Sequence, residues 1–177
     1  MPRWDEEMGV ALDLAREAAA AGEIPVGALV VGPAGDVVAS GRNARSRSFD
    51  PASGGDHREA GAATAAHGGA ANADGEDPTA HAEMVAIRAA AQALGRSRLD
   101  GCTLVVTLEP CTMCAGAVLQ SRLSRLVFGA WDEKAGAVGG RIDVIRESGL
   151  PHDVEVVAGV RADESASLLR DFFASRR

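Results

Sequence analysis

Four residues of this chain have the types and the spacing of a metal site that activates water. His81 and Glu83 lie two positions apart. Cys111 and Cys114 follow in a Pro-Cys-x-x-Cys sequence, and Cys111 is 30 positions after His81. A zinc ion with only three protein ligands keeps its fourth tetrahedral position open for water and lowers the pKa of that water to about 7. We therefore expect one Zn²⁺ per chain, held by His81, Cys111 and Cys114, with Glu83 as the group that moves protons.

The Cys-x-x-Cys spacing is also compatible with two other kinds of site. A thioredoxin-like redox pair is a standard alternative, but it requires neither His81 nor Glu83. A purely structural zinc site needs a fourth protein ligand. The remaining candidates for that ligand are His57, His67, Cys102 and, more remotely, His152. Cys102 opens an apolar run and is expected to be a small buried hydrophobe.

Both halves of the site fall at the start of a predicted helix. Asp77-Pro78-Thr79 precedes an alanine-rich helix over residues 81–94, and Gly95 ends it. An apolar run over 102–108 predicts a buried strand, and a helix over 111–120 follows, with Pro110 tolerated in its first turn. The positive end of a helix dipole favours thiolate and carboxylate, the forms that this chemistry needs.

The rest of the chain alternates between the two kinds of element. A helix over 5–21 and a hairpin of strands 26–31 and 37–40 come first, and strands over 125–129 and 154–160 and a helix over 162–175 come last. With the strand at 102–108 this makes five strands. We predict a single α/β domain over residues 1–177, with a central mixed sheet and helices on both faces.

The segment at about 44–76 differs from its surroundings. From Asp50 to Glu83 there is no apolar side chain larger than alanine or proline, and glycine and alanine are abundant. Such a segment buries too little surface to offset its ordering entropy, so a flexible loop is expected.

Composition limits where the protein works. Three cysteines, two of them in the candidate site, do not suggest a disulfide framework, and the acidic start and lack of a long apolar run predict no signal peptide or membrane span. We expect a cytoplasmic protein. A net charge of −7 disfavours a general nucleic-acid binder but leaves room for a local basic patch.

His-x-Glu followed by Pro-Cys-x-x-Cys is the mark of zinc-dependent nucleobase deaminases. Over nearly its whole length the chain resembles the bacterial tRNA-specific adenosine deaminases, within the wider cytidine and nucleobase deaminase superfamily. Asn43, Phe128-Gly129-Ala130 and Asp171-Phe172-Phe173 narrow the resemblance to the tRNA branch. The similar stretches are residues 24–28, 41–43, 77–83, 107–117, 127–130 and 169–173.

The resemblance implies a cytidine-deaminase-like fold, a homodimer, and hydrolysis of adenosine to inosine at the wobble position of an arginine tRNA anticodon. Glu83 would act first as general base and then as general acid. The adenine of the substrate would be extruded from its stack into the pocket. Asn43 would hydrogen-bond the flipped nucleoside, and Val26 would line the pocket. Asp132 would approach the substrate strand, although Asn43 and Asp132 also suit ordinary turns.

Two departures from the family leave the substrate open. The segment from Ala44 to Gly75 is longer than is usual there, and Trp131 stands where the family often has a small or basic residue. One alternative is a zinc-dependent deaminase of a free nucleobase or nucleoside, of the guanine or cytosine type. The other is a zinc-stabilised binding module without catalysis.

Overall fold

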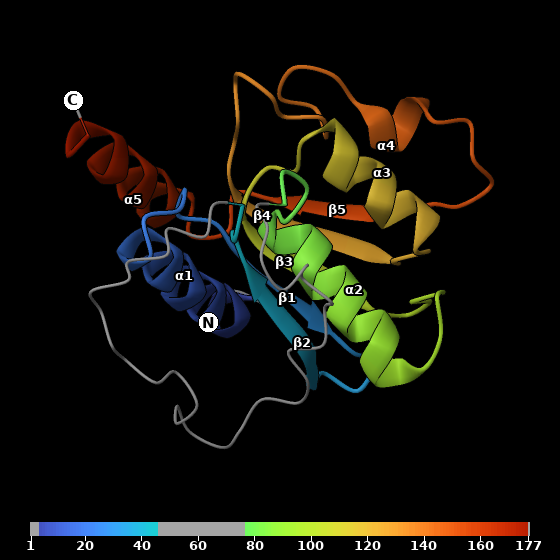
Figure 1. The fold of residues 1–177 in the computed structure, drawn as a ribbon. Coiled ribbons are helices and arrows are strands. Elements are labelled where there is room, and N and C mark those ends of the chain that lie inside the picture. The colour runs from blue at the N-terminus through green and yellow to red at the C-terminus, as the bar shows by residue number, and fades with distance from the viewer. Residues whose placement is uncertain (1–3, 46–76, 177) are drawn as a thin grey trace.

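The computed structural model describes residues 4–45 and 77–176, which form five strands and five helices around one sheet (Figure 1). The α/β class and the mixed five-stranded sheet are thereby confirmed. The helices are α1 (Asp5–Ala20), α2 (Ala82–Leu94), α3 (Thr112–Gln120), α4 (Val144–Glu147) and α5 (Ala162–Ala174). The strands are β1 (Gly27–Val31), β2 (Val37–Arg42), β3 (Thr103–Leu108), β4 (Arg125–Ala130) and β5 (Glu155–Ala158).

The strand order β2-β1-β3-β4-β5 brings four strand ends to one edge of the sheet. β1 is antiparallel to both of its neighbours, whereas β3, β4 and β5 are parallel. Ala28, near the start of β1, pairs with Gly41 on one side and with Val106 on the other. The start of β1 therefore lies between the carboxyl ends of β2 and β3, and the carboxyl end of β4 lies beside that of β3.

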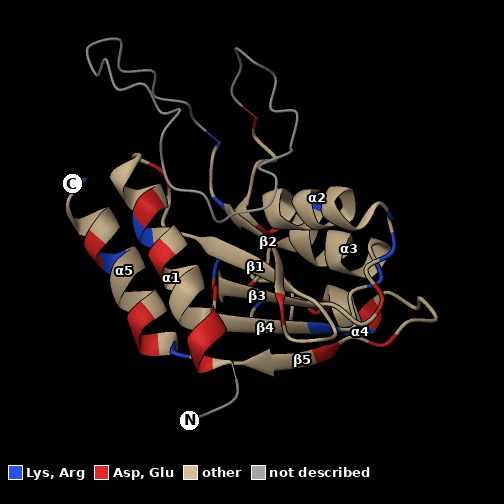
Figure 2. Cartoon of the chain, turned by 90° about the horizontal axis from the view of Figure 1, so that it is seen from below, with Lys and Arg blue, Asp and Glu red and all other residues tan. Residues whose placement is uncertain are grey.

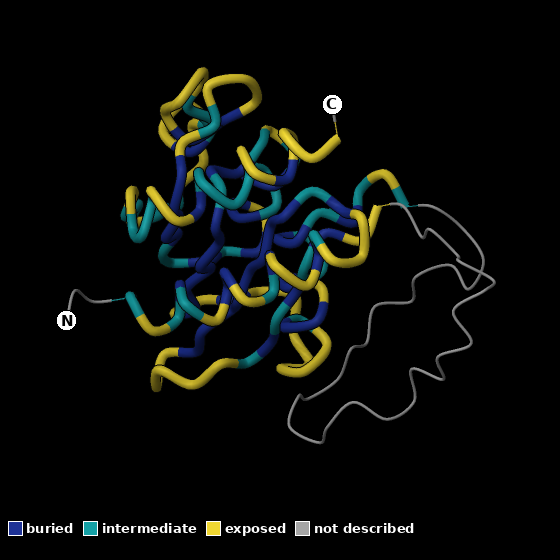
Figure 3. Tube along the Cα trace, turned by 90° about the vertical axis from the view of Figure 1, so that its left-hand side faces the viewer, coloured by how far each residue is buried: buried dark blue, intermediate teal, exposed yellow. Residues whose placement is uncertain are grey.

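Helices cover both faces of the sheet, as predicted (Figures 1 and 2). Side chains alternate between the two faces along each strand. Leu104 and Phe128 face α2 and α3, whereas Val105 and Val127 face α1, and all four are fully buried. Figure 3 shows the buried chain running through the middle of the molecule.

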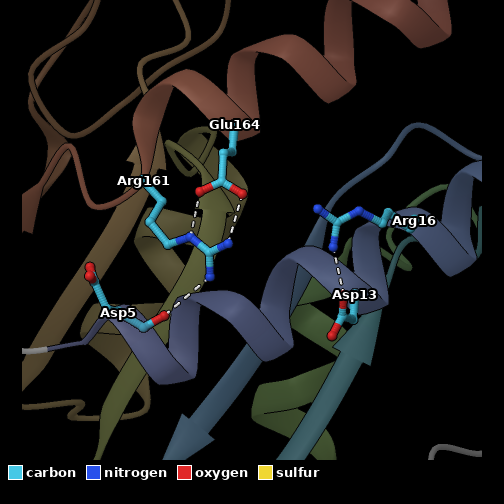
Figure 4. Close-up of polar contacts among 5 residues, drawn as sticks. All are labelled: Asp5, Asp13, Arg16, Arg161 and Glu164. Carbon is cyan, nitrogen blue, oxygen red and sulfur yellow. Dashed lines mark hydrogen bonds and ion pairs between the residues drawn. The ribbon is translucent and has the colours of Figure 1, made fainter. Parts of the chain in front are cut away.

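An arginine links the two helices on the second face (Figure 4). The Arg161 guanidinium donates to both Glu164 carboxylate oxygens at 2.7 Å and to the Asp5 carbonyl oxygen at 3.3 Å. Ion pairs this exposed contribute little to stability. The contact places the start of α5 beside the start of α1.

The element boundaries differ from the predictions by one or a few residues. His81 and Cys111 are not in their helices but are the N-cap residues, with extended backbone angles, and Pro110 lies outside α3 rather than in its first turn. β2 continues to Arg42, and β5 is shorter than expected because Gly159 turns with φ +85°. The four-residue α4 was not predicted.

Almost all of the predicted flexible loop at 44–76 lies outside the described residues. On the two sides of the residues left undescribed, the chain comes together, since the Ala44 N–H donates to the Ala80 carbonyl oxygen at 3.0 Å. In the described part of the chain, no helix combines the length and apolar character needed to cross a bilayer.

Gly41 lets α2 lie directly on β2, and this contact yields a prediction. A Cβ atom at residue 41 would lie 2.5 Å from the Ala82 carbonyl oxygen and 2.7 Å from the Ala86 nitrogen. Gly41→Ala should therefore lower the free energy of unfolding by about 1–3 kcal/mol, measured by denaturant titration. Gly116→Ala is the matched control, because nothing lies within 4 Å of its Cβ and alanine favours a helix. Equal stability of the two variants would contradict this view of the α2–β2 contact.

Candidate zinc centre and active site

The predicted site residues come together at the sheet edge where β2, β3 and β4 end. Asn43 follows β2, Cys111 follows β3, and Asp132 follows β4. His81 is at the start of α2, which packs on β2. In sheets with parallel strands, the crevice outside the carboxyl ends of the strands is the usual place for a ligand.

Local sequence explains why His81 and Cys111 are presented at helix starts. Pro110 has no N–H, so it cannot extend the β3 ladder, and Cys111 after it takes an extended conformation as the N-cap of α3. At α2, the Asn43 side-chain oxygen accepts from the Ala82 N–H at 2.9 Å. Asn43 thus satisfies one of the free N–H groups at the start of α2, and because the His81 side chain makes no capping bond, its imidazole is available for a metal.

The three expected ligands form a nearly equilateral triangle. The His81 Nδ1 atom lies 3.7 Å from the Cys111 sulfur and 3.6 Å from the Cys114 sulfur, and the two sulfurs are 3.7 Å apart. Zinc bonds of about 2.3 Å to sulfur and 2.0–2.1 Å to nitrogen, at tetrahedral angles, require separations of about 3.8 Å between sulfurs and about 3.6 Å between nitrogen and sulfur. The donor set therefore fits a tetrahedral zinc ion.

The three groups of the cluster shift one another's pKa values. Contact with the Cys114 thiol, and then with the His81 imidazole, lowers the pKa of Cys111 to about 3. Contact with Cys111 and burial raise the pKa of Cys114, and the bond to Cys111 raises the pKa of His81. The cluster thus favours a thiolate at Cys111, which is the form that binds zinc, whereas Cys114 and His81, whose pKa values are raised, release protons when the metal binds.

Glu83 lies in the first turn of α2 and is 4% exposed. Burial raises the pKa of its carboxyl, while the neighbouring His81 opposes that shift. Its carboxyl also interacts with Cys114, so it lies against the donor triangle. A proton-transfer group beside a three-ligand metal site is the arrangement that hydrolytic chemistry requires.

The alternative fourth ligands are not at the site where the structure describes them. Within residues 4–45 and 77–176, His81, Cys111 and Cys114 are the one group of three or more potential metal ligands. Cys102 is fully buried in the apolar core, and His152 Nε2 lies 2.8 Å from the Leu123 carbonyl oxygen. His57 and His67 lie outside the described residues.

The three expected substrate contacts have definite structural roles. The Asn43 N–H donates to the Val26 carbonyl oxygen at 3.1 Å, and both residues are 5% exposed, so they lie side by side beneath the start of α2. Asp132 closes a turn: its side-chain oxygen accepts from the N–H groups of Lys134 and Ala135. Asn43, Val26 and Asp132 thus lie at the edge that carries the donor triangle. That each of them contacts the substrate is a proposal.

Glu109 is a buried residue at this edge that sequence reasoning did not single out. It is 2% exposed and accepts hydrogen bonds from three backbone N–H groups. The sequence feature that could have pointed to Glu109 is a carboxylate directly after an apolar strand and two residues before a metal ligand.

The comparisons with known proteins agree with this geometry. The family model for the cytidine and deoxycytidylate deaminase zinc-binding region matches residues 2–130. The chain belongs to this deaminase family. The expected family resemblance is confirmed, and so is zinc as the metal that the donor triangle fits.

Particular relatives of this deaminase act on tRNA. The tRNA-specific adenosine deaminase of Haemophilus influenzae is 42% identical over 98% of this chain and 86% of its own length. The tRNA(Ile)-lysidine synthase of Deinococcus deserti is 46% identical over 98% of this chain, which spans only 27% of that protein. A structure from studies of A-to-I editing by tRNA:A34 deaminases superposes with a TM-score of 0.72 at 38% identity, covering 92% of this chain and 97% of that one.

Removal of one ligand tests the zinc site. Cys111→Ala should abolish stoichiometric zinc binding, because two protein ligands hold the ion much more weakly than three. Zinc per chain is measured by mass spectrometry of the metal after dialysis. Cys102→Ala removes a thiol from the apolar core and should keep its zinc. Full occupancy in the Cys111 variant would contradict the assignment.

Proposed function

We propose that this chain catalyses the hydrolytic deamination of adenosine to inosine at the wobble position of a tRNA anticodon. The observation that carries the proposal is the triangle of His81, Cys111 and Cys114, whose spacing fits a tetrahedral zinc ion, with the buried Glu83 in the helix turn that follows His81. The relative from Haemophilus influenzae, named a tRNA-specific adenosine deaminase, matches 98% of the chain and supports the choice of substrate.

In the proposed reaction, zinc supplies the Lewis acidity that makes a water molecule acidic near neutral pH. Glu83 accepts a proton from the attacking water and delivers it to the adenine ring nitrogen. A C6–O bond forms, Glu83 takes the remaining proton from the new C6 hydroxyl and carries it to the amino group, and the C6–N bond breaks to release ammonia and leave the C6 carbonyl of inosine. One adenosine and one water thus give one inosine and one ammonia.

The neighbouring residues would hold the extruded base. Asn43, fixed by its bond to Ala82, would hydrogen-bond the nucleoside, and Val26 beside it would line the pocket. Asp132, held in its turn at the end of β4, would approach the substrate strand. Each of the three lies at the edge that carries the donor triangle.

The distribution of charge lets a polyanion approach this edge despite the net charge of −7. Many of the acidic residues lie along α1 and α5, which cover the opposite face of the sheet, and others lie near α4 and β5 (Figure 2). α2 contains one acidic residue, Glu83, and α3 contains none. RNA that approaches along α2 and α3 would therefore meet less repulsion than the net charge suggests, although the acidic Asp132 and Glu133 follow β4 at the same edge.

Four further features belong to the proposal. The substrate would be an arginine tRNA, the whole chain would be one catalytic domain, and its reduced thiols would place it in the cytoplasm. A homodimer, as family resemblance implies, would cover exposed apolar side chains that follow β4. These are Ile142 and Leu150.

The direct test compares an arginine tRNA anticodon stem-loop carrying a wobble adenosine with free guanine, cytosine and adenosine. The wild type should convert the stem-loop to inosine, and Glu83→Gln should lower kcat by about 10²–10⁴-fold while keeping its zinc. Glu6→Gln, an exposed change on α1, is the control. Turnover of free bases alone would favour the small-molecule deaminase, and zinc binding without any turnover would favour the binding module.

Asn43 allows its capping role to be separated from its substrate role. Asn43→Asp keeps the oxygen that accepts from Ala82 but replaces the amide NH₂, whereas Asn43→Ala removes both. If the amide binds the nucleoside, Asn43→Asp should raise KM while thermal stability stays near that of the wild type. Asn43→Ala should raise KM and also cost about 1 kcal/mol of stability. If KM of the Asn43→Asp variant equals that of the wild type, the Asn43 amide does not bind the nucleoside. Its role is then limited to the bond with the Ala82 N–H at the start of α2.

A further inference from the structure

The carboxylate of Glu109 is buried beside the zinc centre but is not part of it. Glu109 is 2% exposed and lies between the end of β3 and the turn formed by Pro110 and Cys111. A buried carboxylate is costly unless hydrogen bonds compensate for its lost hydration. Its partners therefore indicate what the residue does.

All three partners of this carboxylate lie in residues 131–143, here called the 131–143 loop. One oxygen, Oε2, accepts from the Asp132 N–H at 3.0 Å. The other, Oε1, accepts from the N–H groups of Val138 at 2.9 Å and Gly140 at 2.8 Å. A single side chain thus holds the beginning and the middle of the loop in place.

The same loop contacts the turn that carries a metal ligand. Gly136 forms an antiparallel bridge with Cys111, and the Ala137 N–H donates to the Pro110 carbonyl oxygen at 2.9 Å. Glu109 therefore fastens the loop to the turn immediately before Cys111, while the loop backbone pairs with the turn itself. The loop also carries Trp131, which is 50% exposed and packs edge-on against Phe128.

We propose that Glu109 is a positioning residue for the substrate site. Through backbone bonds it holds the 131–143 loop against the Pro110–Cys111 turn, so that Asp132 and Trp131 form a rigid wall next to the zinc centre. It acts through the loop and does not touch the substrate. The identity of that substrate, an RNA anticodon, rests on the proposed function.

The hydrogen-bond pattern explains why a carboxylate is needed. Three N–H donors converge on its two oxygens, and an amide offers only one acceptor oxygen. In Glu109→Gln, the remaining oxygen can still accept from the N–H groups of Val138 and Gly140. The NH₂ group then faces the Asp132 N–H, and since both are donors, that hydrogen bond is lost. The glutamine variant should release the start of the loop, next to Trp131, while preserving the shape of the core.

A second variant breaks the same contact from the loop side. A Cβ atom at Gly140 would overlap the Glu109 carboxylate, so Gly140→Ala must displace the loop from it without altering the buried charge. Glu133→Gln is the matched control, because Glu133 is an exposed glutamate of the same loop and loses the same charge.

The experiment measures amide hydrogen exchange in the zinc-loaded protein without substrate, and then kcat and KM on the wobble-adenosine stem-loop. Glu109→Gln and Gly140→Ala should speed exchange in the 131–143 loop and raise KM about tenfold, with kcat within about twofold and zinc content unchanged. The double variant should be no worse than the more severe single variant, because both break one contact. The control should match the wild type.

Three results would overturn the proposal: unchanged exchange in both variants, faster exchange with an unchanged KM, or parallel loss of zinc and kcat. If Glu109→Gln does not fold, Gly140→Ala decides alone, since it keeps the buried glutamate. A wild type that deaminates only a free base would contradict the proposed function, and KM on that base, together with exchange, would still decide the role of Glu109.

Discussion

The structure depends on one geometric requirement: three metal ligands from segments 30 residues apart must lie within 3.7 Å of one another. The sheet register meets this requirement. Because Ala28 pairs with both Gly41 and Val106, the ends of β2 and β3 lie on either side of the start of β1. α2 then rests on Gly41, where a side chain would collide with its backbone, so the two helix starts that carry His81 and Cys111 meet.

Buried polar groups at this edge serve the same requirement. Asn43 caps α2 beside His81, and Glu109 ties the 131–143 loop to the turn that presents Cys111. Each bonds to backbone groups, which compensates for its burial and fixes a segment at the site. Glu83 is also buried, and its carboxyl lies against the donor triangle. The apolar core holds the helices on the sheet, and these polar side chains fix the segments that carry the site residues.

Sequence alone could predict the two pairs of residues at the zinc centre, because the members of each pair are close together in the chain. His81 with Glu83, and Cys111 with Cys114, are each one helical turn or less apart, so a helix start suffices to place each pair. The helix starts themselves were predicted one residue early, since an N-cap residue and a first helical residue follow the same kind of signal. The short α4 has too few residues to show a periodicity.

The role of Glu109 could not be predicted, because its partners are backbone groups 23 to 31 residues away. Backbone N–H groups are the same at every residue except proline, so their donors leave no pattern in the sequence. Asn43 is an intermediate case: its position after a strand indicated a turn or a ligand, and the structure shows a cap on a helix 39 residues later.

X-ray absorption at the zinc edge of the metal-loaded protein tests the central claim most directly, because it counts the ligands of the ion. Two sulfurs at about 2.3 Å and two nitrogen or oxygen ligands at about 2.0–2.1 Å are expected, with outer-shell scattering from a single imidazole. That is the pattern expected for His81, Cys111 and Cys114 with one position left for water. A third sulfur, a second imidazole or the absence of bound zinc would contradict the account.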